Sequence, residues 1–513
     1  MSENKLPEAK CVAVFGTGSD VGKSIVVTAL CRIFTDMGVS VAPYKAQNMS
    51  NNSCVTFEGG EMGRAQVVQA EAARISPHVD MNPVLLKPST DTGAQVVLYG
   101  KPLGNREAKE YFSGNENLSE KALAGLQRLR RAYSLVIMEG AGSCAEINLR
   151  ARDFVNFYMA HAADAPVILV ADIDRGGVFA QIIGTLDIIP KEDRQRVEGI
   201  IINRFRGDAS LFKAGIEFIE DKTGLPVLGL VPYFRHIQID SEDGVPLDTV
   251  IDPPRGPEPG KINIGVIRLP HISNFTDFNP FESDAAVNLY YLVRPRYLQE
   301  YDVIFIPGTK NVRFDMEWLR QSGWAAELST FVGNGGRLCG ICGGYQMLGK
   351  LVRDPCGIEG LPGDTQCLGF LDVETTLHDE KVLTRSVGIW ESNGEYIEGY
   401  EIHMGVTKSG PGMLPVIRVP SKNKLCTDGF DGAATPDGKI WGAYFHGLFD
   451  MPGFRHAFLK AIRADYIPDE SNCGADHISK FKDRQYDLLA EHFRKHLDMS
   501  KLFQISRLEG MMP

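Results

Sequence analysis

The sequence is most constrained near its start, where a short apolar run leads into a glycine-rich loop and then into a helical pattern. Residues 11–15 read Cys-Val-Ala-Val-Phe, residues 16–24 read Gly-Thr-Gly-Ser-Asp-Val-Gly-Lys-Ser, and the helical pattern covers 25–34. A buried strand, a loop and a helix in this order cradle phosphates with backbone N–H groups and a helix N-terminus. Lys23 would reach the terminal phosphates, and Ser24 would bind Mg²⁺. The alternative is a glycine-rich turn that binds no ligand.

Further apolar segments alternate with helical patterns along the first half of the chain. They cover 39–44, 95–99, 134–138, 166–171, 197–203 and 225–231. Strands that alternate with helices at this spacing predict an α/β fold with a mainly parallel, doubly wound sheet. Ligands of such sheets bind at the carboxyl ends of the strands, so the residues just after each strand are candidates for a site.

A run of amides and hydroxyls follows the strand at 39–44. It reads Lys-Ala-Gln-Asn-Met-Ser-Asn-Asn-Ser over 45–53. Such a run is usually a solvated loop, but its place at a strand end favours contact with a polar substrate or a phosphate. The residues that we expect to make this contact are Lys45, Gln47, Asn48 and Ser50. Weaker candidates in the next segments are Arg64, Gln66 and Lys87, since charged side chains are mostly exposed.

A carboxylate follows the strand at 134–138. Glu139 is well placed to hold Mg²⁺ together with Ser24, because Mg²⁺ takes oxygen ligands at such strand ends. The alternative is a loop residue that caps the next helix. Asn48, Asp172 and Asp174 all compete for the role of a third Mg²⁺ ligand.

The composition changes between Asp240 and Gly260, where Asp, Glu, Pro and Gly predominate. This stretch predicts a linker. We therefore expect a phosphate-binding α/β domain over 1–239, a linker over 240–260 and a second α/β domain over 261–513. An amphipathic helix at 481–497 ends the second domain and serves packing.

Cys342 is the candidate nucleophile of the second domain. It stands in Arg-Leu-Cys-Gly-Ile-Cys-Gly-Gly-Tyr-Gln-Met-Leu-Gly over 337–349, where an apolar run turns into a helical pattern through glycines. A strained strand-to-helix turn exposes a nucleophile, and a helix N-terminus favours the thiolate. Two alternatives are a redox or zinc pair with Cys339 and a small buried residue without a role.

His446 is the candidate base that would serve Cys342. It ends an apolar strand at 440–446, and a lone His there is otherwise a satisfied core residue. A cysteine nucleophile in the same domain favours the general-base interpretation. The turn Pro-Gly-Thr-Lys at 307–310 would supply backbone N–H groups for an oxyanion hole, which we assign to Gly308 and Gly343.

Composition excludes several other classes. The net charge of −11 argues against a general nucleic-acid binder, which shows a basic face. The chain contains no apolar run near the ~18 residues that span a bilayer, and its first residues lack the apolar core of a signal peptide. Ten scattered cysteines fit reduced thiols. We therefore expect a cytoplasmic protein that does not contact a membrane.

The glycine-rich loop is longer than the common pattern and resembles that of dethiobiotin synthetase and its relatives, ATP-dependent enzymes that activate carboxylates. The resemblance implies a P-loop NTPase-type domain and an acyl phosphate formed in line with the γ-phosphate. The residues that would bind ATP are Gly16, Thr17, Gly18, Val21, Gly22, Lys23, Ser24 and Asn203.

The second domain resembles class I glutamine amidotransferases, in which a cysteine in a glycine-rich elbow attacks the side-chain amide of glutamine and a distant histidine serves it. The resemblance implies a flavodoxin-like α/β domain with Cys342 as the nucleophile and His446 as the base. That family usually has a Glu two positions after the His, where this chain has Leu448. We therefore expect a Cys-His dyad.

Nearly the whole chain is similar to the cobyric acid synthases of cobalamin biosynthesis. The stretches that carry the resemblance are 45–50, 63–66, 69–72, 80–88, 172–179 and 269–277. The resemblance implies amidation of the b, d, e and g carboxylates of adenosylcobyrinic acid a,c-diamide, with nitrogen from L-glutamine and activation by ATP and Mg²⁺. Ammonia would then cross between the domains through a shielded interface.

Three other functions remain open from the residues alone. A related amidotransferase would act on other carboxylates, as the synthase of the a,c-diamide does, although that enzyme typically has Gly-Pro-Asp-Tyr where this chain has Ala-Gln-Asn-Met at 46–49. A P-loop regulatory ATPase would need no glutaminase. A corrinoid carrier would turn over no ATP. The oligomeric state does not follow from the sequence.

Overall fold

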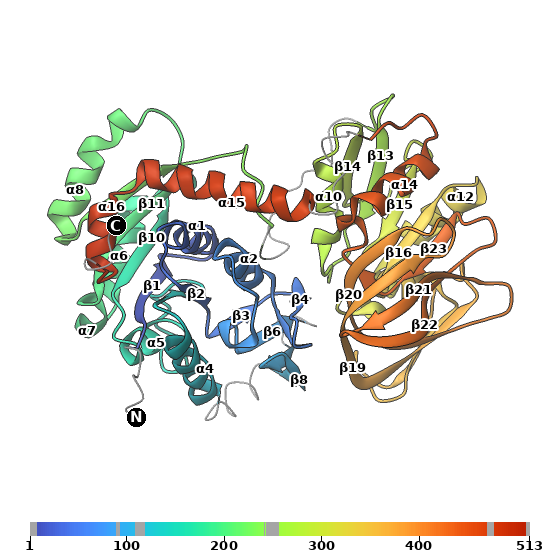
Figure 1. Cartoon of the computed structure of the whole chain (residues 1–513), viewed down its shortest axis with the longest axis horizontal. Coiled ribbons are helices and arrows are strands. Elements are labelled where there is room, and N and C mark those ends of the chain that lie inside the picture. Colours follow the sequence, from blue (N-terminus) through green and yellow to red (C-terminus); the bar gives the residue numbers. More distant parts are fainter. Residues whose placement is uncertain are drawn as a thin grey trace.

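The computed structural model describes residues 8–88, 93–107, 118–240, 242, 256–468 and 477–508. Two domains lie side by side, and helix α15 (His477–His496) runs along the first of them (Figure 1). The start of the chain at 1–7, where we expected no signal peptide, and most of the expected linker at 240–260 lie outside the described residues.

The first domain contains, within the described residues, a six-stranded sheet with the order β12, β11, β10, β1, β9, β2. All neighbouring strands in it are parallel. Side chains of β1 alternate, so Val12 and Val14 pack in one apolar cluster while Ala13 and Phe15 pack in another. Burial on both faces explains why the strands are apolar throughout. The predicted parallel, doubly wound sheet is confirmed. The strands are β1 (Lys10–Gly16), β2 (Val41–Tyr44), β9 (Leu135–Glu139), β10 (Val167–Asp172), β11 (Val197–Phe205) and β12 (Val227–Pro232).

Helices cover both faces of this sheet. Helix α1 packs in the cluster of Val12 and Val14, whereas α4 and α5 pack in the cluster of Phe15. The glycine-rich loop therefore opens directly onto the N-terminus of α1. The helices of this domain are α1 (Lys23–Asp36), α2 (Arg64–Ala72), α4 (Leu118–Ala132), α5 (Phe157–Ala162), α6 (Val178–Ile188), α7 (Lys191–Arg194) and α8 (Lys213–Thr223), with 3-10 turns at η1 (Val79–Met81) and η3 (Ala209–Phe212).

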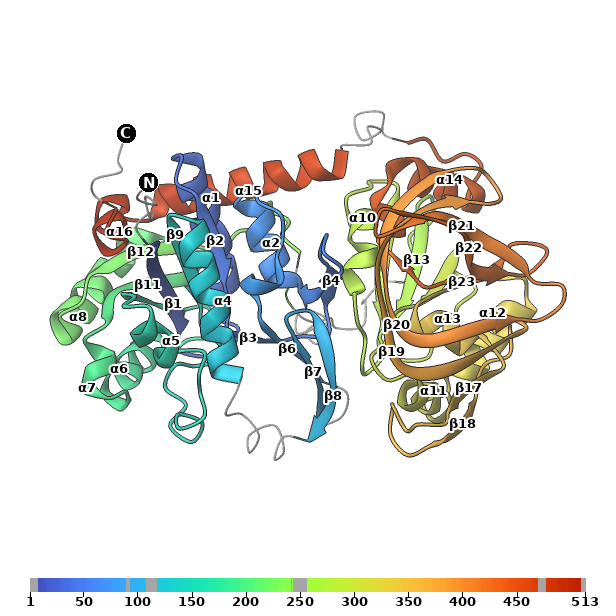
Figure 2. The same ribbon diagram turned by 60° about the horizontal axis from the view of Figure 1, so that its bottom comes forward.

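The predicted strand at 95–99 does not join the main sheet. It falls in β7 (Gly93–Leu98) of a separate sheet with the order β3, β6, β7, β8. This sheet and the β4–β5 hairpin lie on the side of the first domain that faces the second (Figure 2). The other strands are β3 (Gln47–Met49), β4 (Ser53–Val55), β5 (Glu61–Gly63), β6 (Val84–Pro88) and β8 (Lys101–Glu107).

The second domain is built on a sheet whose parallel part has the order β14, β13, β15, β16, β23. Beyond β23 most pairs are antiparallel, and the long strands β19 and β20 form the side toward the first domain. A parallel α/β core is confirmed, and the β-rich later segment extends it. The strands are β13 (Ile262–Ile267), β14 (Val287–Leu292), β15 (Val303–Ile306), β16 (Leu338–Ile341), β17 (Leu351–Asp354), β18 (Gly363–Gln366), β19 (Val373–Trp390), β20 (Tyr396–Ser409), β21 (Leu414–Lys422), β22 (Leu425–Ala434), β23 (Ile440–Ala443) and β24 (Phe445–His446).

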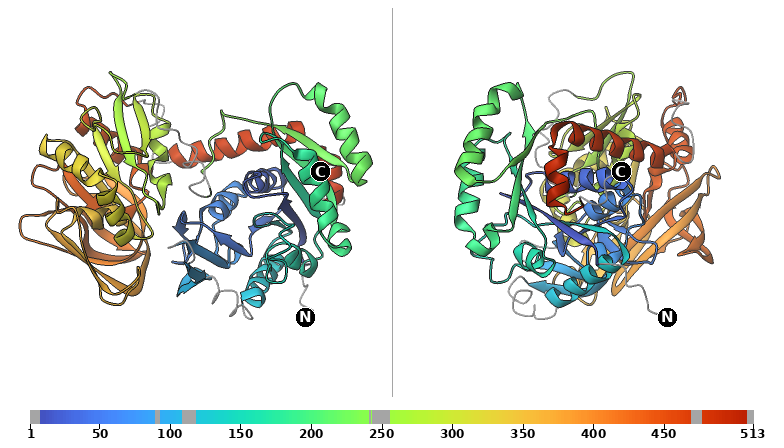
Figure 3. Two further views of the ribbon diagram at one scale, coloured as in Figure 1. Left: turned by 180° about the vertical axis from the view of Figure 1, so that it is seen from behind. Right: turned by 60° about the vertical axis from the view of Figure 1, so that its left-hand side comes forward.

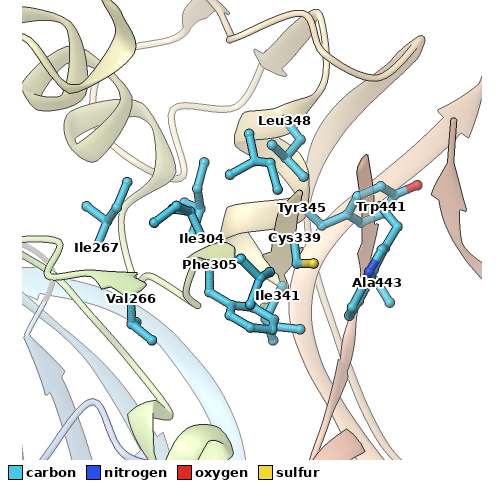
Figure 4. Close-up of a cluster of buried hydrophobic side chains, with 14 of the residues drawn as sticks. Val266, Ile267, Ile304, Phe305, Cys339, Ile341, Tyr345, Leu348, Trp441 and Ala443 are labelled. Carbon is cyan, nitrogen blue, oxygen red and sulfur yellow. The ribbon is translucent and has the colours of Figure 1, made fainter. Parts of the chain in front are cut away.

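The core of the second domain surrounds β15 and β16. Figure 4 shows Cys339 among Phe305, Ile341 and other apolar side chains of this cluster. Burial raises the pKa of the Cys339 thiol, and the thiol is free. Cys339 therefore packs in the core as a free thiol. The helices of this domain are η4 (Phe275–Phe278), α10 (Asn279–Glu282), α11 (Val312–Gln321), α12 (Trp324–Gly333), α13 (Gly343–Leu348), η5 (Leu448–Asp450) and α14 (Pro452–Ile462).

The C-terminal helices return to the first domain, which corrects the predicted unit of 261–513. Helix α15 packs across α1 (Figure 3), where the buried Arg32 donates hydrogen bonds to Asp487 at 2.7 and 2.8 Å. Leu489 and Phe493 of α15 belong to the apolar cluster of α1. The amphipathic pattern predicted a packing helix correctly, but it carries no information about which domain the helix covers. A short helix, α16 (Met499–Ile505), follows.

Candidate active site

The glycine-rich loop holds Lys23 over the carboxyl edge of the first sheet. Gly22 caps α1 with φ of 93°, a left-handed conformation that favours glycine. Lys23 Nζ donates hydrogen bonds to the carbonyls of Gly18 at 3.0 Å and Gly142 at 2.8 Å. Burial and the neighbouring ammonium of Lys45 lower the pKa of Lys23. Lys23 and Lys45 thus lie where the strands end, where their positive charges could neutralise the phosphates of a nucleotide.

Two carboxylates face Ser24 at this edge. Ser24 Oγ lies within hydrogen-bond distance of both, 2.9 Å from Glu139 Oε1 and 2.7 Å from Glu242 Oε2. Lys45 Nζ donates to the same two carboxylates at 2.8 and 2.7 Å. Burial alone would lower the pKa of Lys45, but these carboxylates outweigh it and raise the pKa above its usual range. Ser24 and Glu139, which the sequence predicted to act together, therefore meet Lys45 at one point.

A hydroxyl and two carboxylates fit Mg²⁺, which takes oxygen ligands, keeps several waters and uses one or two carboxylates. Among the described residues no group of three or more His, Cys, Asp and Glu side chains could hold a metal ion. A partly hydrated Mg²⁺ does not need such a cage, so the residues present suit it.

Glu242 is a site residue that sequence reasoning missed, because it stands in the acidic stretch interpreted as a linker. The three residues proposed for a third Mg²⁺ ligand have other partners. Asp172 accepts from Arg204 at 3.0 Å and Asp174 accepts from Arg206 at 2.6 Å. The only signal for Glu242 was its charge.

The remaining predicted residues of this domain lie around the loop. Asn203 Nδ2 donates to the Val21 carbonyl at 3.0 Å, and a Cβ at Gly22 would come within 2.2 Å of that amide. Asn203 therefore holds the glycine-rich loop through its bond to the loop backbone. Thr17 Oγ1 donates to Gln181 at 3.3 Å. Gly16 leaves no room for a side chain, since a Cβ there would lie 2.9 Å from Lys23 Nζ.

The amide-rich segment after β2 does not form a solvated loop. Asn48 Nδ2 donates to Gln66 Oε1 at 3.0 Å, and both side chains are buried. Ser50 Oγ donates to the Glu242 carbonyl at 2.7 Å. Gln47 is half-buried in β3. Asn48 is thus tied to α2, and Ser50 is tied to the backbone of Glu242.

Cys342 lies between β16 and α13 with φ of 52° and ψ of −109°. A left-handed φ in a residue with a side chain is a strained conformation, which marks functional turns. The glycines around it permit close packing, because a Cβ at Gly344 would come within 1.9 Å of the Ile306 carbonyl. The strand, sharp turn and helix occur where the sequence predicted them.

The Cys342 thiol and His446 line one small cavity of about 50 Å³, together with Gly343 and Gln346. A Cβ at Gly308 would lie 3.3 Å from His446 Cε1, and one at Gly343 would lie 3.0 Å from the Thr309 nitrogen. Gly308 therefore packs beside His446, and Gly343, which follows Cys342 in the chain, lines the cavity. This cavity has the parts that an attack on an amide carbonyl requires.

A carboxylate completes the pair, which corrects the expected dyad. His446 Nδ1 lies 2.7 Å from Asp277 Oδ2, and the Gly447 N–H donates to Asp277 Oδ1 at 2.9 Å. Burial lowers the pKa of His446, but the negative charges of Asp277 and of the Cys342 thiolate raise it to about 10. Leu448, at the usual position of the acid, is buried in the apolar core. Asp277 orients the ring and fixes its tautomer.

Comparison with known proteins agrees with both halves of this geometry. Residues 12–247 match the CobQ/CobB/MinD/ParA nucleotide binding domain, and residues 263–454 match the CobB/CobQ-like glutamine amidotransferase domain. The chain is 55% identical over 497 residues to cobyric acid synthase of Chlorobaculum tepidum, which covers 97% of this chain and 98% of that protein. It belongs to the cobyric acid synthase family.

Other cobyric acid synthases show the same coverage. Identity is 53% over 502 residues with the protein of Chlorobium phaeobacteroides strain DSM 266, and 44% over 507 residues with that of Syntrophobacter fumaroxidans. These matches cover 98% and 97% of this chain and 98% of each relative. A crystal structure of a glutamine amidotransferase is 19% identical with a TM-score of 0.30, and covers 39% of this chain and 97% of its own.

Membership of the cobyric acid synthase family confirms the predicted fold and enzyme class. The chain is a glutamine amidotransferase ligase of cobalamin biosynthesis with a nucleotide-binding domain, and glutamine and a corrin are its substrates. The regulatory ATPase and the corrinoid carrier are excluded. Among the described helices none has both the length and the apolar character needed to cross a membrane.

The two domains of the chain meet through buried contacts. The Ser53 N–H of β4 donates to Asn274 Oδ1 at 3.0 Å, and Gln95 Nε2 of β7 lies 3.4 Å from Met404 Sδ of β20. Tyr400 and Ile402 of β20 join the apolar cluster of the first domain. The contact is therefore not an open gap of solvent width.

Proposed function

We propose that this chain amidates the b, d, e and g carboxylates of adenosylcobyrinic acid a,c-diamide, using L-glutamine, ATP and Mg²⁺. The observation that carries the proposal is the pairing of two sites in one chain. One is the Cys342–His446–Asp277 constellation, and the other is the Ser24–Glu139–Lys45 cluster at a phosphate-binding loop. Free thiols throughout the described chain support a reducing, cytoplasmic setting.

The first half-reaction releases ammonia in the second domain. The Cys342 thiolate attacks the side-chain amide carbon of glutamine, while backbone N–H groups at Gly308 and Gly343 stabilise the oxyanion. His446, held by Asp277, gives its proton to the leaving nitrogen, so ammonia departs and a thioester forms. Water, deprotonated by His446, then cleaves the thioester and releases glutamate.

The second half-reaction activates a corrin carboxylate in the first domain. A carboxylate oxygen attacks the γ-phosphorus of ATP, and ADP leaves with the electron pair of the broken bond. Lys23 and Lys45 neutralise the phosphate charges at the strand ends. Ammonia then attacks the acyl carbon, phosphate leaves, and the proton lost by the nitrogen passes to phosphate or solvent.

Mg²⁺ would be held by Ser24, Glu139 and Glu242, the oxygen donors that converge beside the loop. When bound, it would neutralise charge on the β- and γ-phosphates. The protein's own part is to keep these donors together with Lys45 in a buried cluster. Asn203 keeps the loop in place by its bond to Val21.

The experiment that tests the proposal is mass spectrometry of adenosylcobyrinic acid a,c-diamide after incubation with the protein, ATP, Mg²⁺ and glutamine. We expect four successive conversions of carboxylate to amide. Cobyrinic acid, which still carries the a and c carboxylates, serves as the comparison substrate. An unchanged a,c-diamide alongside an amidated cobyrinic acid would contradict the assigned substrate and favour the a,c-diamide synthase reaction.

A further inference from the structure

A buried cluster of three charged residues joins the two domains. Glu61 of β5 is fully buried and accepts hydrogen bonds from Lys87 Nζ at 2.6 Å and from Lys381 Nζ at 2.5 Å. Lys87 belongs to the first domain, whereas Lys381 comes from β19 of the second. Lys381 also donates to Gln95 Oε1 at 3.0 Å. A buried ion pair stabilises a fold little more than apolar side chains of the same size would. Stability alone therefore does not account for this cluster.

The cluster forms part of the wall of the glutaminase cavity. Lys87 and Lys381 line the same cavity as Cys342 and His446. The first domain thereby contributes a side chain to the space in which glutamine is hydrolysed. The two domains must be docked for this wall to be complete.

The cluster is also bonded to the turn that orients the catalytic histidine. Ser53 Oγ accepts from Lys87 at 2.8 Å and donates to Glu61 at 2.8 Å. The Ser53 N–H donates to Asn274, which begins the η4 turn that carries Asp277. A change at Glu61 therefore reaches both the cavity wall and the support of the His446 ring.

On its other side, the cluster leads toward the phosphate-binding loop. Ser53 pairs with Gly63 in the β4–β5 hairpin. A Cβ at Gly63 would lie 2.7 Å from Asn48 Nδ2 and 3.1 Å from Gln66 Oε1. Gly63 has φ of −62°, which any residue can adopt. Glycine is required there because the neighbouring side chains leave no room for a Cβ.

From Gly63 a row of buried amides continues to Glu139. Gln66 and Gln69 lie one turn apart on α2, and Gln69 Nε2 donates to Glu139 Oε2. Gln66 Nε2 and Gln69 Oε1 are buried without a hydrogen-bond partner among the described residues. Unpaired buried polar atoms are costly and uncommon, so each calls for an explanation. A small molecule that both donates and accepts hydrogen bonds, as ammonia does, would satisfy them.

We propose that Glu61, with Lys87 and Lys381, couples the glutaminase cavity to the synthetase site and directs ammonia past Gly63, Gln66 and Gln69 to Glu139. This inference rests on the proposed function. Glu61 acts as a positioning residue, because it touches neither glutamine nor the reacting carboxylate. Its loss uncouples glutamine hydrolysis from amidation.

Two variants test the proposal in the full-length protein. Glu61→Gln keeps the shape of the side chain and removes the charge that both lysines share. Gly63→Ala adds one methyl group to the route and leaves Cys342, Lys23 and Glu139 unchanged. Gly184→Ala on α6, where a Cβ would meet nothing within 4 Å, is the matched control. Lys381→Arg keeps the positive charge and is the conservative variant of the cluster.

The measurement is the ratio of glutamate released to corrin amide formed, together with amidation driven by ammonium chloride and a thermal melt. We expect the ratio to rise about tenfold in Glu61→Gln and in Gly63→Ala, which corresponds to ~1.4 kcal/mol of lost coupling. Ammonium-driven amidation should stay within about twofold of the parent, as expected of sites away from the chemistry. Lys381→Arg and Gly184→Ala should keep the parent ratio.

A parent ratio in both Glu61→Gln and Gly63→Ala would overturn the proposal, whatever happens to the absolute rates. Loss of ammonium-driven amidation in both would also overturn it, because the cluster would then serve only the structure of the first domain. Gly63→Ala decides the question if Glu61→Gln unfolds. A parent protein that amidates no corrin from either nitrogen source would refute the proposed function itself, and the coupling role with it.

Discussion

The Nδ1 atom of His446 lies 2.7 Å from Oδ2 of Asp277, although 169 positions separate the two residues in the chain. The same carboxylate accepts the Gly447 N–H, so it fixes both the ring and the backbone beside it. The second domain thus has a complete Cys-His-Asp arrangement in which the acid comes from the η4 turn after β13. Leu448, two residues after the histidine, therefore packs in the apolar core.

Asp277→Asn should lower the glutaminase rate by about 10²–10⁴-fold, because the amide no longer holds the imidazole in its tautomer or stabilises its charged form. Amidation from ammonium chloride should stay at the parent rate, since it does not use His446. The two rates are measured side by side with the same corrin substrate. A glutaminase rate within threefold of the parent, about 0.6 kcal/mol, would show that a dyad suffices.

The pH dependence of glutaminase activity should report the charge on His446. Burial lowers the pKa of His446, and Asp277 and Cys342 outweigh it to give about 10. Because this folded pKa lies above the unfolded value of about 6.5, the stability it contributes is full below pH 6.5 and disappears as pH rises through about 10.

We expect glutaminase activity to decline with rising pH near that value. In Asp277→Asn the decline should move by at least ~1 unit toward neutral pH, since the carboxylate that favours the charged ring is gone. Rates from pH 6 to 11 in both proteins test this. If activity declined at the same alkaline pH in the parent and in Asp277→Asn, the decline would not report the charge on His446.

Glu242→Gln should weaken Mg²⁺ binding by about 10–100-fold, the usual effect of removing one supporting carboxylate. The readout is the Mg²⁺ concentration that half-saturates nucleotide binding, measured by calorimetry without corrin. Glu217→Gln, on the exposed side of α8, is the control. If the half-saturating Mg²⁺ concentration did not change, Glu242 would not belong to the metal site.

Phe493→Ala should destabilise the first domain by about 3–5 kcal/mol, because Phe493 of α15 is fully buried against α1. Glu491→Ala, on an exposed position of the same helix, should cost less than about 0.5 kcal/mol. Hydrogen exchange measured by mass spectrometry would show faster exchange in α1. Faster exchange confined to β13, β15 and β16 would contradict the docking of α15 on the first domain.

Local signals in the sequence predicted the parts of the fold that local chemistry determines. The strand, glycine-rich loop and helix around Lys23 occur as expected, and so does the strained turn at Cys342. The parallel sheet followed from the alternation of strands and helices, and the carboxyl ends of its strands correctly indicated where Ser24, Lys45 and Glu139 meet.

The residues that the sequence did not reveal all act across long distances in the chain. Asp277 reaches His446 through the packing of η4 against β24, and no spacing rule connects them. Glu242 stands in a stretch whose composition is typical of a linker, yet it bonds to Ser24. Helix α15 has an apolar face that would suit either domain. Such contacts depend on the assembled tertiary structure.

The most direct test of the two-site account is the source of the nitrogen in the product. The protein is incubated with ATP, Mg²⁺, the corrin a,c-diamide, glutamine labelled with ¹⁵N at the side-chain amide, and an excess of unlabelled ammonium chloride. The account predicts that the new amides carry mainly ¹⁵N in the parent and only unlabelled nitrogen in Cys342→Ser. Product nitrogen that follows the ammonium pool in the parent would contradict the delivery of ammonia from Cys342 to the synthetase site.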